Sequence, residues 1–561
     1  MLRKIIYFAF CTIILTSTIC VLGETVSTEK WVGTNYTPAY ACNQVQFWHD
    51  FRSDSVVKEL DAAKKYFALN TLRVYLHPIN FEQDKENFFK NLESFIQICA
   101  ARKIKPGFTF FDDCHRHENI YLDKPTEPIK GYHNGRWAAS PQDRDRDLNN
   151  LDRYKPYIQE IIGKYKNDNR ILWWETFNEP NMKSKWSVEM RKASYKFAKE
   201  INPKQPIICC WDESPETDIV NVHNYTVDFK QWDRQTELNP SKGCMFTEAG
   251  ARWFAPRQNS GEPVDVIRWL EYRKSQNKYT PGVYLCWELM VGNSNCRWYW
   301  ETPQNSPEPT VPWCGLMWSD CTPVSLAESE AIRKYITGKS NALLFDDFTK
   351  TNFSTTAATT NNPENIGKWR IYSNQKNQYS FEPNVNKLES NSIQIANDKV
   401  WNNSHDDYIL ECRTMLLSEN GNAGLIFRVN DLGNNGVDDF NGYYVGFDKN
   451  TLYLGKMKKQ SQNIDSNKIN QPSWNELQRF DLNKLECKVT LGVWNQIRIA
   501  VKGNQIRVWF NRMHESTDKE NGLRINYTDN NSPVQKGTVG MRTFKCNANF
   551  DNIIVCPNDN L

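Results

Sequence analysis

The sequence lacks several features that would place a chain of this size in a common functional class. Its formal net charge is only +3 over 561 residues, too small for an electrostatic grip on nucleic acid. No two cysteines have the C-x-x-C spacing of a zinc site. After residue 24 no stretch is apolar enough to span a bilayer. We therefore expect no nucleic-acid partner, no zinc centre and no transmembrane segment in the mature chain.

The one long apolar run begins the chain. Residues 1–23 start with the basic Arg3 and Lys4, continue as an apolar stretch and end with Val21 and Gly23 in the cleavage positions. This pattern predicts a secretory signal peptide, and hence a secreted, periplasmic or cell-surface protein. A membrane anchor is the alternative, but the run falls near or below the roughly 18 apolar residues that a span needs.

The chain has 16 cysteines, of which two lie in the predicted signal peptide. The fourteen that remain are an even number, which in an exported protein is consistent with disulfides. Their connectivity cannot be read from the sequence. We expect Cys314 with Cys321, and Cys546 with Cys556, as local pairs.

Residues 24–338 alternate between apolar strand candidates and amphipathic helix candidates. Near-continuous apolar strands separated by helices indicate a parallel sheet covered by helices. Eight strands in about 310 residues suit an eightfold α/β barrel, the (β/α)8 TIM barrel. An open doubly wound sheet is the alternative, weakened because no glycine-rich phosphate loop follows the first strand. The expected strands are 30–36, 70–76, 105–111, 171–177, 206–211, 219–225, 243–250 and 282–290.

The texture changes after the short polar segment 337–342. Residues 343–558 carry short alternating strands divided by turns rich in Asn, Asp and Gly, with almost no helical periodicity. This pattern predicts an all-β sandwich of the jelly-roll type. Because the switch is abrupt, we expect the second domain to fold independently.

Two carboxylates stand out in the segment WWETFNEPN, residues 173–181. In a β/α barrel the carboxyl ends of the strands line the active site, and Glu179 follows the fourth strand at that end. Glu248 ends the seventh strand, so the two can face each other across the barrel mouth. Glycosidic bond cleavage needs such a pair. Glu175 lies deeper on the same face as Glu179, and we interpret it as a structural carboxylate.

At this point the sequence resembles clan A glycoside hydrolases, and family 5 most closely. WETFNEP resembles the fourth-strand signature, and five further motifs follow the order of the strands over residues 30–338. They are Arg73 on the second strand, DCH (113–115) after the third, HNY (223–225) on the sixth, TEAG (247–250) on the seventh and Trp287 on the eighth. Each motif alone is weak, but six in the right order are specific.

The resemblance implies a role for each matching residue. Glu179 would be the acid/base and Glu248 the nucleophile, with no cofactor and no metal in the site. The other implied residues would contact substrate or orient the nucleophile: Asn178, Arg73, His223, Tyr225, Trp287, His115 and Asp113. Each also has a structural interpretation, as an ion-pair partner, a core side chain or a rim residue. Glu288 is a rival nucleophile, but strand alternation points it away from the face of Trp287.

Two long inserts, 114–150 and 291–323, follow the third and eighth strands. They carry five tryptophans and three histidines. Because βα loops rise from the catalytic face, we expect both inserts to bring these side chains to the rim of a walled pocket or short cleft, rather than a long open groove.

Residues 343–558 resemble the concanavalin-like jelly rolls found beside glycosidase domains, which implies a carbohydrate-binding domain or a structural cap. Asp346, Asp347 and Asp551 lie near the two chain ends of this domain and could hold Ca²⁺. Charge on an edge strand or capping of turns is the alternative role. The sequence thus predicts an exported retaining β-glycosidase that acts on a polysaccharide or its oligosaccharides. The alternative is a carbohydrate-binding protein that keeps the barrel without turnover.

Overall fold

The computed structural model describes most of the chain after residue 29. The described residues are 30–114, 119–124, 126–226, 228–252, 262–348, 364–366, 368–373, 386–397, 399–401, 405–432, 438–459, 473–513 and 518–558. The predicted signal peptide lies outside them. Within them, no helix has the length and apolar character that crossing a membrane requires.

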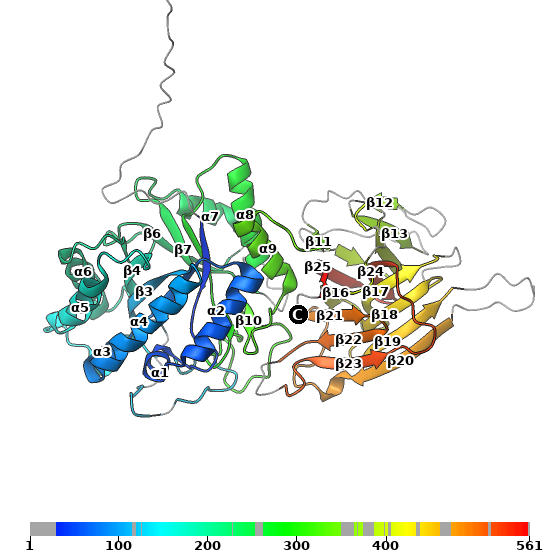
Figure 1. Cartoon of the computed structure of the whole chain (residues 1–561), viewed down its shortest axis with the longest axis horizontal. Coiled ribbons are helices and arrows are strands. Elements are labelled where there is room, and N and C mark those ends of the chain that lie inside the picture. The colour runs from blue at the N-terminus through cyan, green and yellow to red at the C-terminus, as the bar shows by residue number, and fades with distance from the viewer. Residues whose placement is uncertain are drawn as a thin grey trace, which may run out of the picture.

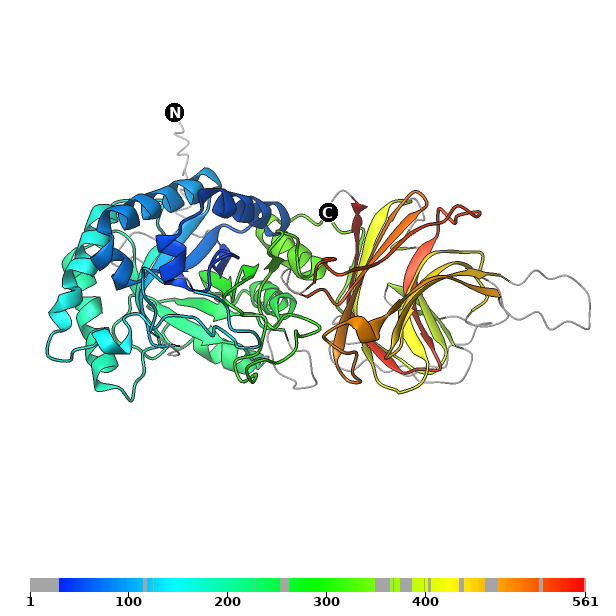
Figure 2. The same cartoon turned by 90° about the horizontal axis from the view of Figure 1, so that it is seen from below.

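The first domain is an eight-stranded parallel sheet curled into a nearly closed barrel, as predicted (Figures 1 and 2). The strand order β5-β4-β3-β2-β1-β8-β7-β6 leaves only β5 and β6 without a pairing between them. The strands are β1 (Trp31–Asn35), β2 (Thr71–Tyr75), β3 (Lys105–Asp112), β4 (Trp173–Asn178), β5 (Ile207–Ile208), β6 (Val220–Asn224), β7 (Cys244–Ala249) and β8 (Val283–Cys286).

Helices surround the barrel because each carries one apolar face toward the sheet. They are α1 (Gln44–His49), α2 (Ser53–Phe67), α3 (Pro78–Gln83), α4 (Lys85–Ala101), α5 (Lys155–Tyr165), α6 (Lys185–Glu200), α7 (Phe229–Thr236), α8 (Pro263–Ser275) and α9 (Leu326–Thr337). Ser325 caps the N-terminus of helix α9, and Gly338, with φ 72°, caps its C-terminus. This helix is the last element of the first domain.

Large side chains fill the barrel interior. Trp173 on β4 is fully buried and lies against Gly107 of the neighbouring β3. A Cβ at Gly107 would come within 2.0 Å of the Trp173 indole, so only glycine leaves room for this ring.

The second domain is a sandwich of two antiparallel sheets packed face to face, as predicted (Figure 2). One sheet has the order β11-β25-β16-β21-β22-β23, with β14 also on β25. The other has the order β12-β13-β15-β24-β17-β18-β19-β20. Their bounds are β11 (Leu344–Asp346), β12 (Glu364–Ile366), β13 (Trp369–Ser373), β14 (Asn386–Leu388), β15 (Ser392–Ala396), β16 (Tyr408–Leu416), β17 (Asn422–Asn430), β18 (Asn441–Phe447), β19 (Thr451–Lys458), β20 (Ser473–Asp481), β21 (Trp494–Lys502), β22 (Gln505–Phe510), β23 (Leu523–Thr528), β24 (Thr538–Phe544) and β25 (Ala548–Pro557).

The sheet that contains β25 turns its outer face toward the barrel, and the two domains share a buried interface. Side chains from α9 and from β16, β21 and β25 form one apolar cluster. The Glu411 carboxylate accepts from the Leu326 backbone N–H at 2.7 Å, and the Arg498 guanidinium donates to the Pro323 carbonyl at 2.9 Å. The domains are therefore joined by packing and by buried polar contacts, not only by the chain.

The cysteine pairs expected from the sequence are wrong. Cys314, Cys321, Cys546 and Cys556 are separate buried thiols, like nine of the other ten described cysteines, and no described cysteine is in a disulfide. A buried Cys packs as a small apolar side chain, and closeness along the chain does not bring two Cβ atoms into bonding geometry.

The three aspartates considered for Ca²⁺ have separate protein partners. Asp346 accepts from the Trp369 indole at 2.8 Å, and Asp347 from Arg268 at 3.2 Å. Asp551 pairs with Arg413 at 2.9 Å. They form none of the candidate metal-binding groups found among the described residues.

Candidate active site

Glu179 and Glu248 meet at the carboxyl ends of β4 and β7. Glu179 directly follows β4 with φ 41°, a left-handed conformation that non-glycine residues rarely adopt. Glu248 is the fifth residue of β7. One oxygen from each carboxylate and one ring nitrogen of His223 all lie within 4.8 Å of one another. The fold thus brings two carboxylates from distant parts of the sequence to a separation that one sugar bond can bridge.

Glu248 is held by three donors. The Arg73 guanidinium donates to its Oε1 at 2.6 Å, the Tyr75 hydroxyl to the same oxygen at 2.9 Å and the Tyr225 hydroxyl to its Oε2 at 2.7 Å. Burial by itself would raise the pKa of Glu248. The charges of His223 and Arg73, together with the hydrogen bonds from Tyr225 and Arg73, outweigh burial and lower that pKa below its ordinary value. The carboxylate is therefore kept ionised.

Glu179 is tied to His223 on β6. The His223 Nδ1 lies 2.7 Å from Glu179 Oε1, and its Nε2 lies 3.0 Å from the Thr247 hydroxyl. Burial would lower the pKa of His223, but the charge of Glu248 and the hydrogen bond and charge of Glu179 raise it above its ordinary value. The ring thus hydrogen-bonds to Glu179 and lies beside Glu248, whose Oε2 is 3.6 Å from its Nδ1.

Glu175 lies one layer deeper and is fully buried, in line with a structural role. The Arg73 Nε and Nη2 donate to its two oxygens at 2.6 and 2.7 Å, and Thr109 and Asn221 donate to it at 2.8 and 3.0 Å. A buried carboxylate with this many donors is fully satisfied. Arg73 therefore pairs with Glu175 and Glu248 at the same time.

Asn178, the last residue of β4, is held on both sides. Its Oδ1 accepts from Arg73 at 2.7 Å, and its Nδ2 donates to Asp112 Oδ1 at 2.9 Å. Asp112 also accepts from the Trp137 indole at 2.6 Å, and burial raises its pKa to about 7. This network fixes the orientation of the Asn178 amide.

Of the two residues expected from the DCH motif, one lies apart and one is outside the described residues. Asp113 pairs with Arg146 at 2.6 Å and accepts from the Asn181 backbone N–H at 2.8 Å, with no exposed side-chain surface. Its neighbour Asp112 is the residue that contacts Asn178. His115 is not among the described residues.

Aromatic side chains border the pair. Trp287 follows β8 and packs edge-on against Tyr75 at 6.0 Å and Trp137 at 5.9 Å. On the other side Tyr225 packs against Trp300 at 5.7 Å and Trp313 at 5.6 Å. Trp137, Trp300 and Trp313 come from the two long inserts, so both inserts contribute to this aromatic wall.

The expectation that all five insert tryptophans reach the rim is wrong. Trp298 is 2% exposed and its indole donates to the Pro307 carbonyl at 2.9 Å. Trp318 lies at the interface with the sandwich, where Arg512 stands over its ring.

Cys114 is a site residue that the sequence reasoning missed. Its thiol contacts the Glu179 carboxylate, and burial together with the nearby carboxylates raises the pKa of the thiol. The available signal was its position, directly after the third strand, inside the DCH motif. It is also the one described cysteine that is only half-buried.

Glu288, the rival nucleophile, is turned away from the pair. Its carboxyl is fully buried and accepts from the Ser294 hydroxyl, and burial raises its pKa to about 8. A carboxyl that keeps its proton at neutral pH is a poor nucleophile.

Two groups of side chains in the described part of the chain are close enough to hold a metal ion. They are Glu175–Cys210–His223 and Glu179–His223–Glu248. Their atoms already hydrogen-bond to protein donors and to one another, which suits proton transfer.

Comparisons with known proteins find carbohydrate-active proteins for both domains. The model of the 3-keto-alpha-glucoside-1,2-lyase-like domain matches residues 356–556. No curated protein matches the chain. Among solved structures, a family 5 subfamily 18 glycoside hydrolase from Streptomyces cattleya is 13% identical over 55% of this chain and 81% of its own, with a TM-score of 0.40.

Two further solved structures match at the same identity of 13%. The match to the exo-beta-1,4-mannosidase Op5Man5 from an Opitutaceae bacterium covers 55% of this chain and 60% of the mannosidase chain, with a TM-score of 0.39. The match to carbohydrate-binding module 66 from Bacillus subtilis covers 34% of this chain and 97% of the module, with a TM-score of 0.24.

Proposed function

We propose that this protein is an exported retaining β-glycosidase that hydrolyses O-glycosidic bonds of a polysaccharide or its oligosaccharides. One observation carries the proposal: Glu179 and Glu248 face each other at strand ends with oxygens within 4.8 Å. Retaining enzymes hold their carboxyl groups about 5–5.5 Å apart, whereas inverting enzymes need about 6.5–9.5 Å to admit a water molecule. The spacing therefore supports direct attack by a carboxylate.

In the first step Glu248 attacks the anomeric carbon while Glu179 gives its proton to the leaving glycosidic oxygen. The C–O bond to the leaving group breaks and an ester forms between Glu248 and the sugar. The ionised state of Glu248, supported by Arg73 and Tyr225, keeps the attacking oxygen available. The leaving group departs as an alcohol.

In the second step water replaces the leaving group. Glu179, now a carboxylate, takes a proton from the water, whose oxygen attacks the anomeric carbon and releases Glu248. Formation of the ester has removed the charge of Glu248, so a negative Glu179 no longer faces a second carboxylate. Asn178 is fixed beside the pair, where its amide can contact a sugar hydroxyl.

The test is turnover on aryl β-glycosides by the whole protein and by matched Glu→Gln variants. Glu179→Gln and Glu248→Gln should each lower turnover by about 10²–10⁴ or more, whereas Glu288→Gln should leave it unchanged. A 2-fluorosugar inactivator should label the peptide that contains Glu248. Release of no phenol from any aryl glycoside by the parent protein would leave the carbohydrate-binding alternative standing.

A further inference from the structure

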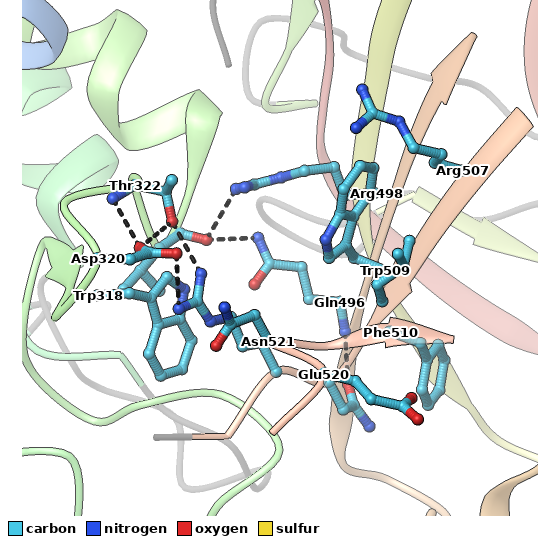
Figure 3. Close-up of a pocket in the computed structure, with 14 residues that line it drawn as sticks. Trp318, Asp320, Thr322, Gln496, Arg498, Arg507, Trp509, Phe510, Glu520 and Asn521 are labelled. Atoms are coloured by element: carbon cyan, nitrogen blue, oxygen red, sulfur yellow. Dashed lines mark hydrogen bonds and ion pairs between the residues drawn. The ribbon is translucent and has the colours of Figure 1, made fainter. Parts of the chain in front are cut away.

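A cavity of about 350 Å³ lies where the barrel meets the sandwich (Figure 3). One side is the turn after β10 (Met317–Trp318), and the other is formed by β21, β22 and the segment before β23. None of the residues assigned above to the carboxylate site lines it. It is therefore a separate cavity, formed by both domains together.

Two tryptophans and their stacked guanidinium groups line opposite sides of the cavity. On the barrel side Arg512 stands 5.0 Å from the Trp318 ring and pairs with Asp320 at 2.9 Å. On the sandwich side Arg507 stands 5.2 Å from the Trp509 ring. Cation–π contact and ion pairing hold these planar groups in place before any ligand arrives.

The turn that carries Asp320 is itself rigid. Asp320 Oδ1 accepts from the backbone N–H and the hydroxyl of Thr322 at 3.0 and 2.7 Å, and Thr322 accepts from Arg512 at 2.8 Å. Between them, Cys321 takes φ 71°, in the left-handed region that non-glycine residues rarely adopt. The barrel side of the cavity is thus bound directly to the sandwich through Arg512.

Several polar groups at the cavity lack a protein hydrogen-bond partner, Arg512 Nε among them. Asn521 Oδ1 is buried with no hydrogen bond, and the Arg507 side chain makes no ion pair or hydrogen bond, as far as the described residues show. By contrast Gln496, beside them, donates to the Val324 carbonyl at 2.8 Å. A buried carbonyl oxygen without a donor costs free energy. It therefore points to a ligand that supplies one.

The chemistry of the lining fits one ligand class. Of the three arginines in the lining, Arg512 pairs with Asp320 and Arg498 with Glu411. Arg507 is then the one lining guanidinium without a carboxylate partner among the described residues, which is less than the cluster of cations that a phosphate site uses. Flat indoles suit the C–H faces of sugar rings, while amide and guanidinium groups suit hydroxyls, which both donate and accept. The volume lies at the lower end of the roughly 300–1,000 Å³ typical of small-molecule pockets.

We infer that this cavity binds one or two units of a neutral saccharide at a site distinct from the catalytic pair. The choice of a saccharide rests on the proposed function, but binding here needs no turnover. Such a site would hold a polymer chain at the junction of the two domains.

Calorimetry on the full chain tests this inference. Glu248→Gln is used as the background so that the sugars survive, and the probes are mannohexaose, cellohexaose and chitohexaose. We expect two bound molecules of one of these sugars per chain, and one after Trp509→Ala or Arg507→Ala is added. The matched control is Trp474→Ala, which removes an exposed tryptophan from β20 on the other sheet and should keep both sites.

The outcomes separate this inference from the proposed function. In the background with an intact Glu248, Trp509→Ala and Arg507→Ala should keep kcat/KM on a small aryl glycoside within about twofold. If the parent protein cleaves no glycoside but loses one bound sugar with Trp509→Ala, the proposed function is wrong and the cavity site stands. One binding event per chain, unchanged by both cavity variants, would overturn the cavity site. Melting curves identify any variant that fails to fold. If Trp509→Ala does not fold, the number of sugars bound by Arg507→Ala tests the cavity site.

Discussion

Replacement of Tyr225 by phenylalanine removes one hydroxyl from the site and nothing else. The hydroxyl donates to Glu248 Oε2 at 2.7 Å, while the ring packs on Trp300 and Trp313, contacts that phenylalanine can keep. A hydrogen bond to a charged group contributes about 1.5–3 kcal/mol. At about 1.36 kcal/mol per pKa unit, its loss should raise the pKa of Glu248 by about one to two units.

The sign of the effect on activity follows from the ionised role of Glu248. Its pKa is lowered in the folded protein, so the nucleophile stays charged to acidic pH. In Tyr225→Phe the acidic limb of the kcat/KM profile should move upward by about one to two pH units, since protonation of Glu248 begins earlier. The Arg73 and Tyr75 donors remain, so activity at neutral pH should persist at a reduced level.

The assay is a pH–rate profile on an aryl β-glycoside, with melting temperatures to confirm folding. Tyr195→Phe is the matched control because it deletes an equally short phenol–carboxylate bond, to Asp218 at 2.7 Å, on α6 outside the barrel. Its profile should overlay the parent's. An unshifted acidic limb in a folded Tyr225→Phe protein would refute the assignment of Glu248 as the group that must be ionised.

Three further predictions follow from the structure. Methyl methanethiolsulfonate reacts with thiolates, and the pKa of the Cys114 thiol is raised, so the parent protein should be inactivated slowly at neutral pH and faster as the pH is made alkaline. Cys114→Ala should be spared because Cys114 is the half-buried thiol that contacts Glu179; equal inactivation of both proteins would place the reactive thiol elsewhere. Burial raises the pKa of Asp551 to about 8, so Asp551 takes up a proton on folding and the melting temperature should fall as pH rises from about 4 to 8. Asp551→Asn should flatten that dependence, and an identical slope in both proteins would argue against it. A chain that ends at residue 340 should be unstable and lose turnover even on small substrates, because it exposes Leu326 and Ala327 at the start of α9 and removes the Arg413 that pairs with Glu262 at 2.9 Å; a soluble, active barrel would show that the sandwich is dispensable.

Most of the fold could be predicted because its signals are local. Each barrel strand is a short apolar run between amphipathic helices. Each sandwich strand alternates apolar and polar residues and is bounded by turns rich in Asn and Gly. The eight expected strands all form, although β5 shrinks to Ile207–Ile208. Glu179 and Glu248 could be placed because the strand ends of a parallel barrel share one face.

The rest depends on contacts that no local pattern records. The third strand continues to Asp112, one residue beyond the predicted end, so Asp112 rather than Asp113 faces Asn178. A shift of one residue turns a strand side chain to the opposite face. Likewise, the inserts could be found by their length, but their mutual packing could not, as in the hydrogen bond from the Asn305 N–H to the Lys130 carbonyl at 2.9 Å. The partners of the cysteines and of Trp318 are equally long-range.

Arg73 makes the site a single unit in evolutionary terms. One guanidinium on β2 joins Asn35 on β1, Glu175 and Asn178 on β4, and Glu248 on β7. Loss of this arginine would leave a buried carboxylate uncompensated, at a cost of about 3–5 kcal/mol, before any catalytic effect is counted. An evolving sequence could lose the Arg73 charge without this cost only if its partners on the three other strands changed at the same time. Drift toward an inactive barrel should therefore begin at Glu179, which lies outside this cluster and whose loss leaves the barrel interior intact.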